Sequence, residues 1–135
     1  MPAPQTLLQP YAERFSDGTC KNSPTASEVI KDVGAVSSLT GKVILITGAT
    51  AGLGVETARA LHETGAKLYI TARNAKKAEQ VIKDITSTSS SKIPISIIQL
   101  DLSSLKSVRA AAEEFLSKEK TLNILINNAG KLPHT

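Results

Sequence analysis

Apolar residues recur along the chain in two patterns, which together predict strands and helices in alternation. Short runs rich in β-branched side chains are typical of strands buried on both faces of a parallel sheet. Longer segments carry apolar residues at helical spacing, which predicts amphipathic helices. The predicted strands are Val43–Ile46, Lys67–Thr71, Ile95–Leu100 and Leu122–Ile126, and the helices between them are Gly52–Thr64, Ala75–Ile85 and Ser104–Ser117.

Each predicted helix should turn one apolar stripe toward the sheet and a polar side toward solvent. The stripes are Leu53, Ala58 and Leu61 on the first helix, Ala78, Val81, Ile82 and Ile85 on the second, and Leu105, Val108, Ala112 and Phe115 on the third. His62 lies near the polar side of the first helix, so we expect it at the surface.

Strands and helices that alternate with short connections require parallel strands joined by right-handed crossovers. We therefore expect an α/β fold, a three-layer Rossmann-like parallel sheet with strand order 3-2-1-4 along the chain. Pro94 opens the third strand, and Ser96 and Gln99 lie inside it, which fits an edge position. The switch point between the first and fourth strands is where such sheets bind ligands.

The chain before the first strand divides into two parts. Residues 1–24 show no period and predict a poorly ordered arm. Thr25 and Glu28 have the spacing of a capping box, which begins a short helix that Gly34 can end. We therefore divide the chain into a poorly ordered arm, 1–24, and a half-domain, 25–135, that contains the predicted Rossmann-like sheet.

Three glycines, Gly48, Gly52 and Gly54, lie between the first strand and the first main helix. Glycine allows backbone to approach a phosphate closely, and a helix N-terminus presents free N–H groups with a partial positive charge. The segment therefore predicts an anion site. Its spacing is neither Gly-x-Gly-x-x-Gly nor a P-loop, since no Gly-Lys-Ser/Thr follows.

Thr47-Gly-x-x-x-Gly-x-Gly54, together with Asn127-Asn-Ala-Gly130 after the fourth strand, resembles the short-chain dehydrogenase/reductase family. The resemblance covers about Leu39 to Gly130, and within the family it is greatest to retinol-dehydrogenase-like and WW-domain oxidoreductase-like members. It implies an oxidoreductase that passes hydride between a nicotinamide cofactor and an alcohol/carbonyl pair.

The resemblance also implies roles for individual residues. The glycines and the loop residues Thr50, Ala51 and Leu53 would surround the cofactor pyrophosphate. Asp101 would accept a hydrogen bond from the adenine amino group, and Leu102 would supply a backbone or apolar contact. The alternative for Asp101 is a place in the cap of the next helix.

Asn127-Asn128-Ala129-Gly130 would complete the site from the fourth strand. Ala129 and Gly130 would leave space for the nicotinamide ribose. For Asn128, a structural role at the strand end is as good an interpretation as direct contact with the cofactor.

Arg73 decides the predicted cofactor. An NAD site usually has Asp or Glu at the end of the second strand, whereas here no carboxylate occurs before Glu79. Arg73 can donate charge-assisted hydrogen bonds to a 2′-phosphate, so NADP(H) is favoured. The alternative is a solvated surface charge, which applies more strongly to the neighbouring Lys76 and Lys77.

The family's Tyr-x-x-x-Lys pair does not occur in the 135 residues, because Phe15 follows Tyr11 and Arg73 follows Tyr69 at that spacing. We therefore expect an amino-terminal, cofactor-binding half, cut after the fourth strand and inactive alone, with a small-molecule substrate only in a full-length form. The alternatives are a non-catalytic NADP-binding or interaction module and a non-functional truncated product.

Composition adds little. The net charge of +4 mildly favours a polyphosphate ligand, and no nucleic-acid partner is predicted. The single cysteine, Cys20, can form no internal disulfide. No apolar run approaches the roughly 20 residues that span a membrane, and no signal peptide is recognisable, so a cytoplasmic location is expected. The apolar fourth strand, with one edge unpaired, predicts marginal stability and self-association.

Overall fold

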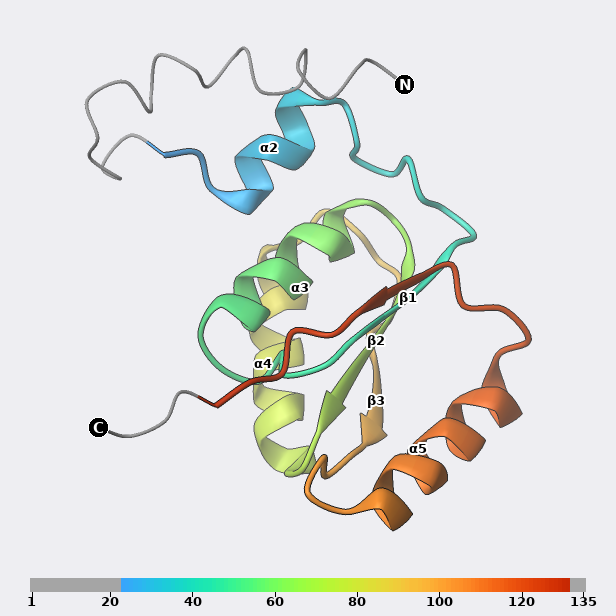
Figure 1. Cartoon of the computed structure of the whole chain (residues 1–135). Coiled ribbons are helices and arrows are strands. Elements are labelled where there is room, and N and C mark those ends of the chain that lie inside the picture. Colours follow the sequence, from blue (N-terminus) through green and yellow to red (C-terminus); the bar gives the residue numbers. More distant parts are fainter. Residues whose placement is uncertain (1–22, 132–135) are drawn as a thin grey trace.

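The computed structural model describes residues 23–131 and contains one four-stranded parallel sheet (Figure 1). Its strands are β1 (Val43–Ile46), β2 (Lys67–Ala72), β3 (Ser96–Gln99) and β4 (Ile124–Ile126). They lie in the order β3-β2-β1-β4, which confirms the predicted order and the edge position of β3. Residues 1–22 of the predicted arm, with Cys20, lie outside the described residues.

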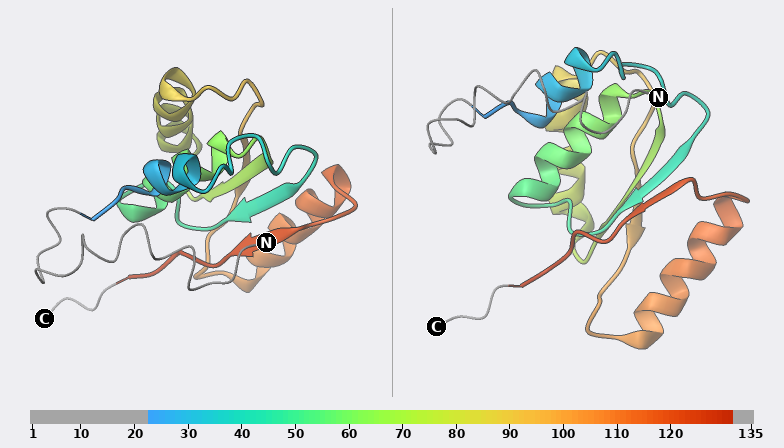
Figure 2. Two further views of the ribbon diagram at one scale, coloured as in Figure 1. Left: turned by 90° about the horizontal axis from the view of Figure 1, so that it is seen from above. Right: turned by 45° about the horizontal axis from the view of Figure 1, so that its top comes forward.

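The helices form layers on both sides of this sheet. They are α2 (Ala26–Asp32), α3 (Leu53–Glu63), α4 (Ala75–Thr88) and α5 (Leu105–Lys118). Figures 1 and 2 show α3 and α4 on one face of the sheet, α5 on the other, and α2 outside α3. The predicted three-layer α/β architecture is therefore confirmed.

Side chains of each strand alternate between the two faces, as the pleat requires. Ile44 and Ile46 of β1 belong to the core under α3 and α4, whereas Val43 and Leu45 face α5. The parallel register places side chains of neighbouring strands on the same face, so that Ile44 lies between Leu68 of β2 and Ile124 of β4. The core under α3 and α4 is consequently the larger of the two.

Three helices, α2, α4 and α5, begin at an N-cap residue whose side chain accepts a hydrogen bond from the first turn. Thr25 and Glu28 make the predicted capping box, with the Glu28 N–H donating to Thr25 Oγ1 at 3.2 Å. Asn74 and Ser104 cap α4 and α5 by accepting from the backbone N–H three residues later. These bonds satisfy helix-terminal amides that would otherwise lack partners.

Three residues of the predicted apolar stripes are exposed. Leu53 is 84% exposed and Leu105 is 75% exposed, because each is the first residue of its helix and stands at the carboxyl edge of the sheet. Ala112 is also exposed, and Ala111 and Phe115 are the buried residues of α5. The stripes of α3 and α5 were therefore predicted only in part, whereas the α4 stripe is confirmed.

The C-terminal end of α5 is held to the sheet by a cluster of Tyr69, Glu119 and Lys67. The Tyr69 hydroxyl donates to Glu119 Oε1 at 2.6 Å, Lys67 forms an ion pair with the same oxygen, and the Tyr69 ring meets Phe115 edge-on. Burial raises the pKa of the Tyr69 phenol, and the Lys67 hydrogen bond lowers the pKa of the Glu119 carboxyl. Tyr69 therefore has a structural role, far from the glycine loop.

His62 corrects the expectation of a surface residue, because its side chain is fully buried. Its Nδ1 lies 2.8 Å from Ser89 Oγ and its Nε2 lies 2.6 Å from the Ile93 carbonyl oxygen. A neutral imidazole that accepts from Ser89 and donates to Ile93 satisfies both atoms. The ring therefore joins α3 to the serine-rich connection between α4 and β3, which a helical wheel of α3 alone does not reveal.

We predict that His62→Leu destabilises the fold by about 1–3 kcal/mol, because the buried Ser89 hydroxyl loses the acceptor for its proton and the partly buried Ile93 carbonyl loses its donor. Urea unfolding followed by circular dichroism measures the loss. The control is Ser90→Ala, which removes only an exposed bond to Glu63 and should change stability by less than about 0.5 kcal/mol. Equal stability of His62→Leu and the parent chain would contradict this role.

Candidate cofactor site

The loop from β1 to α3 has the conformation that its glycines predict. Gly48 has φ +69° and Gly52 has φ +57°, a region that side chains with a Cβ rarely adopt. Gly52 occupies the N-cap position of α3, and no side chain caps it. The first amides of α3 are therefore left for an external acceptor, and the helix dipole favours an anion there.

Close backbone packing holds this loop against α3. A Cβ on Gly54 would lie 2.2 Å from the Gly48 carbonyl oxygen and 2.6 Å from Asn128 Nδ2. A Cβ on Gly48 would lie 2.6 Å from the Ala129 Cα. Only glycine fits at either position, so the loop approaches the helix start and the end of β4 at backbone distance.

Asn128 makes this junction rigid. Its Nδ2 donates to the Thr47 and Gly48 carbonyl oxygens at 3.0 and 3.2 Å. These bonds show that Asn128 has the structural role that the sequence left as one of two interpretations. Contact with a cofactor stays a prediction for this residue.

Thr47 is a site residue that the sequence prediction did not include. Its side chain is buried, and its Oγ1 accepts from the Ala129 N–H at 3.0 Å. Its own N–H donates to the Ile126 carbonyl oxygen at 3.0 Å. Thr47 therefore ties β1 to the residues that follow β4, and its place directly before Gly48 was the signal available in the sequence.

Arg73 and Asp101 lie at the carboxyl ends of the neighbouring strands β2 and β3. Ala72 pairs with Gln99, which brings the residues that follow each strand to one edge. The hydrogen bonds from Ser103 lower the pKa of the Asp101 carboxyl, and the charge of the exposed Arg73 adds a smaller effect in the same direction. The edge thus presents a guanidinium beside an ionised carboxylate.

Asp101 does not cap α5, contrary to the alternative considered for it. Ser104 is the N-cap, and Asp101 Oδ1 instead accepts from the Ser103 N–H at 2.9 Å and from its hydroxyl at 2.7 Å. The Asp101 N–H donates to Ser107 Oγ at 2.9 Å. Asp101 therefore braces the turn before α5, and its carboxylate keeps lone pairs for a further donor.

The remaining predicted residues lie around the same edge. Leu53 at the start of α3 and Leu102 after β3 both present exposed side chains, at 84% and 57%. Thr50 and Ala51 lie in the turn of the loop, and Gly130 follows Ala129, where an added Cβ would meet only the Asn128 carbonyl oxygen, at 4.0 Å. The structure thus gathers all the predicted residues at one edge of the sheet, and which of them touch a cofactor stays a prediction.

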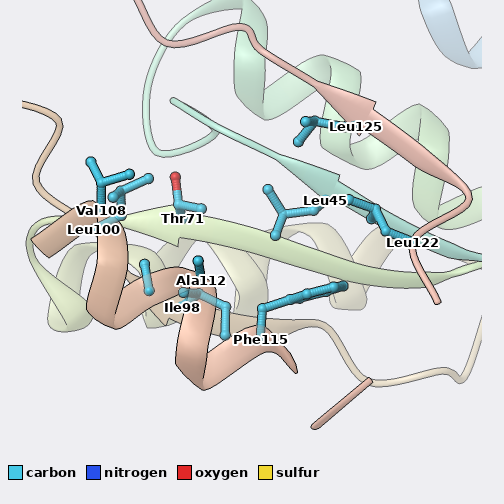
Figure 3. Close-up of a pocket in the computed structure, with 10 residues that line it drawn as sticks. Leu45, Thr71, Ile98, Leu100, Val108, Ala112, Phe115, Leu122 and Leu125 are labelled. Carbon is cyan, nitrogen blue, oxygen red and sulfur yellow. The ribbon is translucent and has the colours of Figure 1, made fainter. Parts of the chain in front are cut away.

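A second feature, an apolar groove, lies on the face of the sheet that α5 covers only in part (Figure 3). It has a volume of about 270 Å³, and its lining, apart from Thr71, is apolar. The lining residues are Leu45, Thr71, Ile98, Leu100, Val108, Ala111, Ala112, Phe115, Leu122 and Leu125. It is distinct from the glycine loop and carries no charged group.

Other kinds of site find no support in the part of the chain that the structure describes. No group of three or more His, Cys, Asp or Glu side chains could hold a metal ion among residues 23–131. Within the same residues, every helix is too short or too polar to cross a membrane.

Comparison with known proteins agrees with this geometry. Residues 42–135 match the family model described as short chain dehydrogenase. The chain belongs to this family. Short-chain dehydrogenase/reductase prx1 of Penicillium rubens is 39% identical over 122 residues, which cover 90% of this chain and 34% of that protein. That match is longer than residues 42–135, so it extends into the segment before β1.

Two further relatives support the assignment to the short-chain dehydrogenases. Retinol dehydrogenase 11 of Homo sapiens is 47% identical over 92 residues, covering 68% of this chain and 29% of that protein. A metagenomic short-chain oxidoreductase, solved in complex with NADP, superposes with a TM-score of 0.63 at 33% identity, covering 70% of this chain and 41% of that one. The chain thus spans about a third of the length of the curated relatives it matches.

Gly54→Ala should lower the free energy of unfolding by about 1–3 kcal/mol, because the added methyl group meets the Gly48 backbone as well as the Asn128 side chain, and the backbone cannot turn aside. Gly130→Ala is the matched control, since its Cβ would meet no atom closer than 4.0 Å, and it should change stability by less than about 0.5 kcal/mol. Thermal and urea unfolding of both variants measure the difference. Equal stability of the two variants would show that the helix start can move away from the loop.

Proposed function

We propose that this chain is the NADP(H)-binding half of an oxidoreductase that acts, in a longer form, on an alcohol/carbonyl pair. The single observation that carries the proposal is the uncapped start of α3 at the switch point between β1 and β4. Such a start accepts a pyrophosphate without any rearrangement of the fold. Membership of the short-chain dehydrogenases supports hydride transfer as the reaction.

Arg73 supports NADP(H) over NAD(H). It is exposed at the end of β2, where a carboxylate would bind the two ribose hydroxyls of NAD. A guanidinium there can donate two hydrogen bonds to a 2′-phosphate. The NADP complex of the metagenomic relative is in agreement with this choice. Asp101, two positions beyond the end of β3, would accept a hydrogen bond from the adenine amino group.

The 135 residues by themselves should bind cofactor without turnover. They contain no Tyr-x-x-x-Lys pair, and general acid–base groups typically contribute about 10²–10⁴-fold in rate. A substrate and any catalysis therefore belong to a longer form. The second candidate function is a purely NADP-binding module, which the missing Tyr-x-x-x-Lys pair favours. A cytoplasmic location stays a prediction.

We expect the chain to bind NADPH more tightly than NADH, and Arg73→Glu to reverse or abolish this preference, because a carboxylate repels the 2′-phosphate. Calorimetric titration with both cofactors measures it. The control is Arg109→Glu, which makes the same charge change at an exposed position on α5. Equal affinities for the two cofactors, unchanged by Arg73→Glu, would refute the assignment of the 2′-phosphate to Arg73.

Self-association through β4 is a further part of the proposal. In the described chain β4 is an edge strand that pairs only with β1, and Thr121–Gly130 contains no charged residue. Unpaired edges without charges favour pairing between copies. Leu125, 52% exposed beside the groove, adds apolar surface to this edge.

Leu125→Lys should shift the purified chain from a concentration-dependent oligomer toward a monomer, because the charge opposes burial of the edge. The substitution is tolerable in the fold because Leu125 is half exposed, unlike the neighbouring Ile124, which packs against the core. Light scattering after size-exclusion chromatography measures the mass. Leu116→Lys, at a 68% exposed position on α5, is the control that should leave the mass unchanged. A parent chain that stays monomeric at every concentration would remove this part of the proposal.

A further inference from the structure

The segment that joins α2 to β1, residues 33–42, closes the C-terminal end of α3, and we call it the strap. The Ser37 N–H donates to the Glu63 carbonyl oxygen at 3.0 Å, and the Leu39 N–H donates to the Thr64 carbonyl oxygen at 2.9 Å. The last carbonyls of a helix have no partner within the helix. The strap therefore supplies hydrogen-bond donors to carbonyl groups at the end of α3 that have none within the helix.

Ser37 is held in a strained conformation to make this contact. Its φ of +57° is the only positive value of a non-glycine residue among those described, and such a conformation costs energy for a residue with a Cβ. Thr40 Oγ1 donates to the Ser37 carbonyl oxygen at 2.8 Å and fixes the turn. Gly65 allows the close approach, since a Cβ there would lie 2.9 Å from Thr40 Oγ1.

These bonds act along the axis of α3, because helix carbonyls point along the axis toward the C-terminus. The other contacts of α3 act from its sides: Arg59 reaches Asp84 and Thr88 on α4, and His62 reaches Ser89. At its start α3 meets the loop through the close contact of Gly54 with Gly48. At its C-terminal end, the strap is the contact best placed to resist sliding of α3 along its own length. A slide of the helix would move its first amides by the same distance.

We infer that the strap is a positioning device for the cofactor site, in which Ser37 and Leu39 set the axial position of α3 and so the place of its anion-binding amides. Most of the strap, residues 33–41, lies before the match to the family model, which begins at residue 42. The inference rests on the proposed cofactor function. Ser37 and Leu39, at the end of α3 that is far from the cofactor, would then help to determine NADP(H) affinity.

The test combines amide hydrogen exchange of the chain without cofactor and titration with NADPH. Ser37→Pro removes the donor and cannot adopt a positive φ, so amides of α3 should exchange faster while those of β2 and α4 keep their rates. NADPH affinity should fall by roughly fivefold or more, as expected for the loss of one hydrogen bond. Ser37→Gly keeps the donor and relieves the strain, so it should leave both readouts as in the parent chain.

Two further variants separate positioning from loss of stability. Phe115→Leu, on the opposite face of the sheet, should lower the Tm without changing NADPH affinity or the exchange of α3 relative to other elements. Ser37→Val keeps the N–H but opposes the positive φ, so it should give an intermediate effect if Ser37→Pro does not fold. An equal loss of NADPH affinity in Phe115→Leu, or unchanged exchange of α3 in the Ser37 variants, would overturn the inference. Failure of the parent chain to bind NADPH would refute the proposed function, while the exchange of α3 would still decide whether the strap positions the helix.

Discussion

The contact between Gly48 and Gly54 is the constraint on which the cofactor site depends. Backbone meets backbone there at a distance that leaves no room for a Cβ, and Asn128 donates across the junction to Thr47 and Gly48. Protein interiors transmit such contacts because they are close-packed and yield little. This contact fixes how closely the start of α3 approaches the ends of β1 and β4.

The same helix is held at three other places, and each uses a different kind of interaction. Arg59 forms an ion pair with Asp84, His62 forms buried hydrogen bonds to Ser89 and Ile93, and the strap caps the last carbonyls. The buried bonds matter most for stability, because an unsatisfied buried group costs more than an exposed ion pair contributes. A helix restrained at both ends and on its sides can present an anion site without further ordering when a ligand binds.

The two faces of the sheet differ in how completely they are covered. Under α3 and α4 the strand side chains form one continuous core, whereas beside α5 they leave an apolar groove next to the unpaired edge of β4 (Figure 3). Apolar surface of this kind favours association. Four residues of α5 line the groove, Val108, Ala111, Ala112 and Phe115, and of these only Ala111 and Phe115 are buried.

The sequence by itself determined the order and type of the described strands and of the helices between them, the strand order, the glycine loop and its partner after β4. These depend on local periodicity, on glycine at special backbone angles and on the handedness of crossovers, which act within short stretches or follow general rules. Strand and helix limits were predicted to within a few residues, for example Leu122–Ile126 against the observed Ile124–Ile126. Only the tertiary structure decided that His62 is buried, that Leu53 and Leu105 are exposed, and that Ser37 and Leu39 close α3. Each of these depends on which distant segment covers a residue. The serine-rich connection lies over His62, whereas no segment among residues 23–131 covers Leu53 at the start of α3. A helical wheel describes one helix, whereas burial and capping are properties of its neighbours.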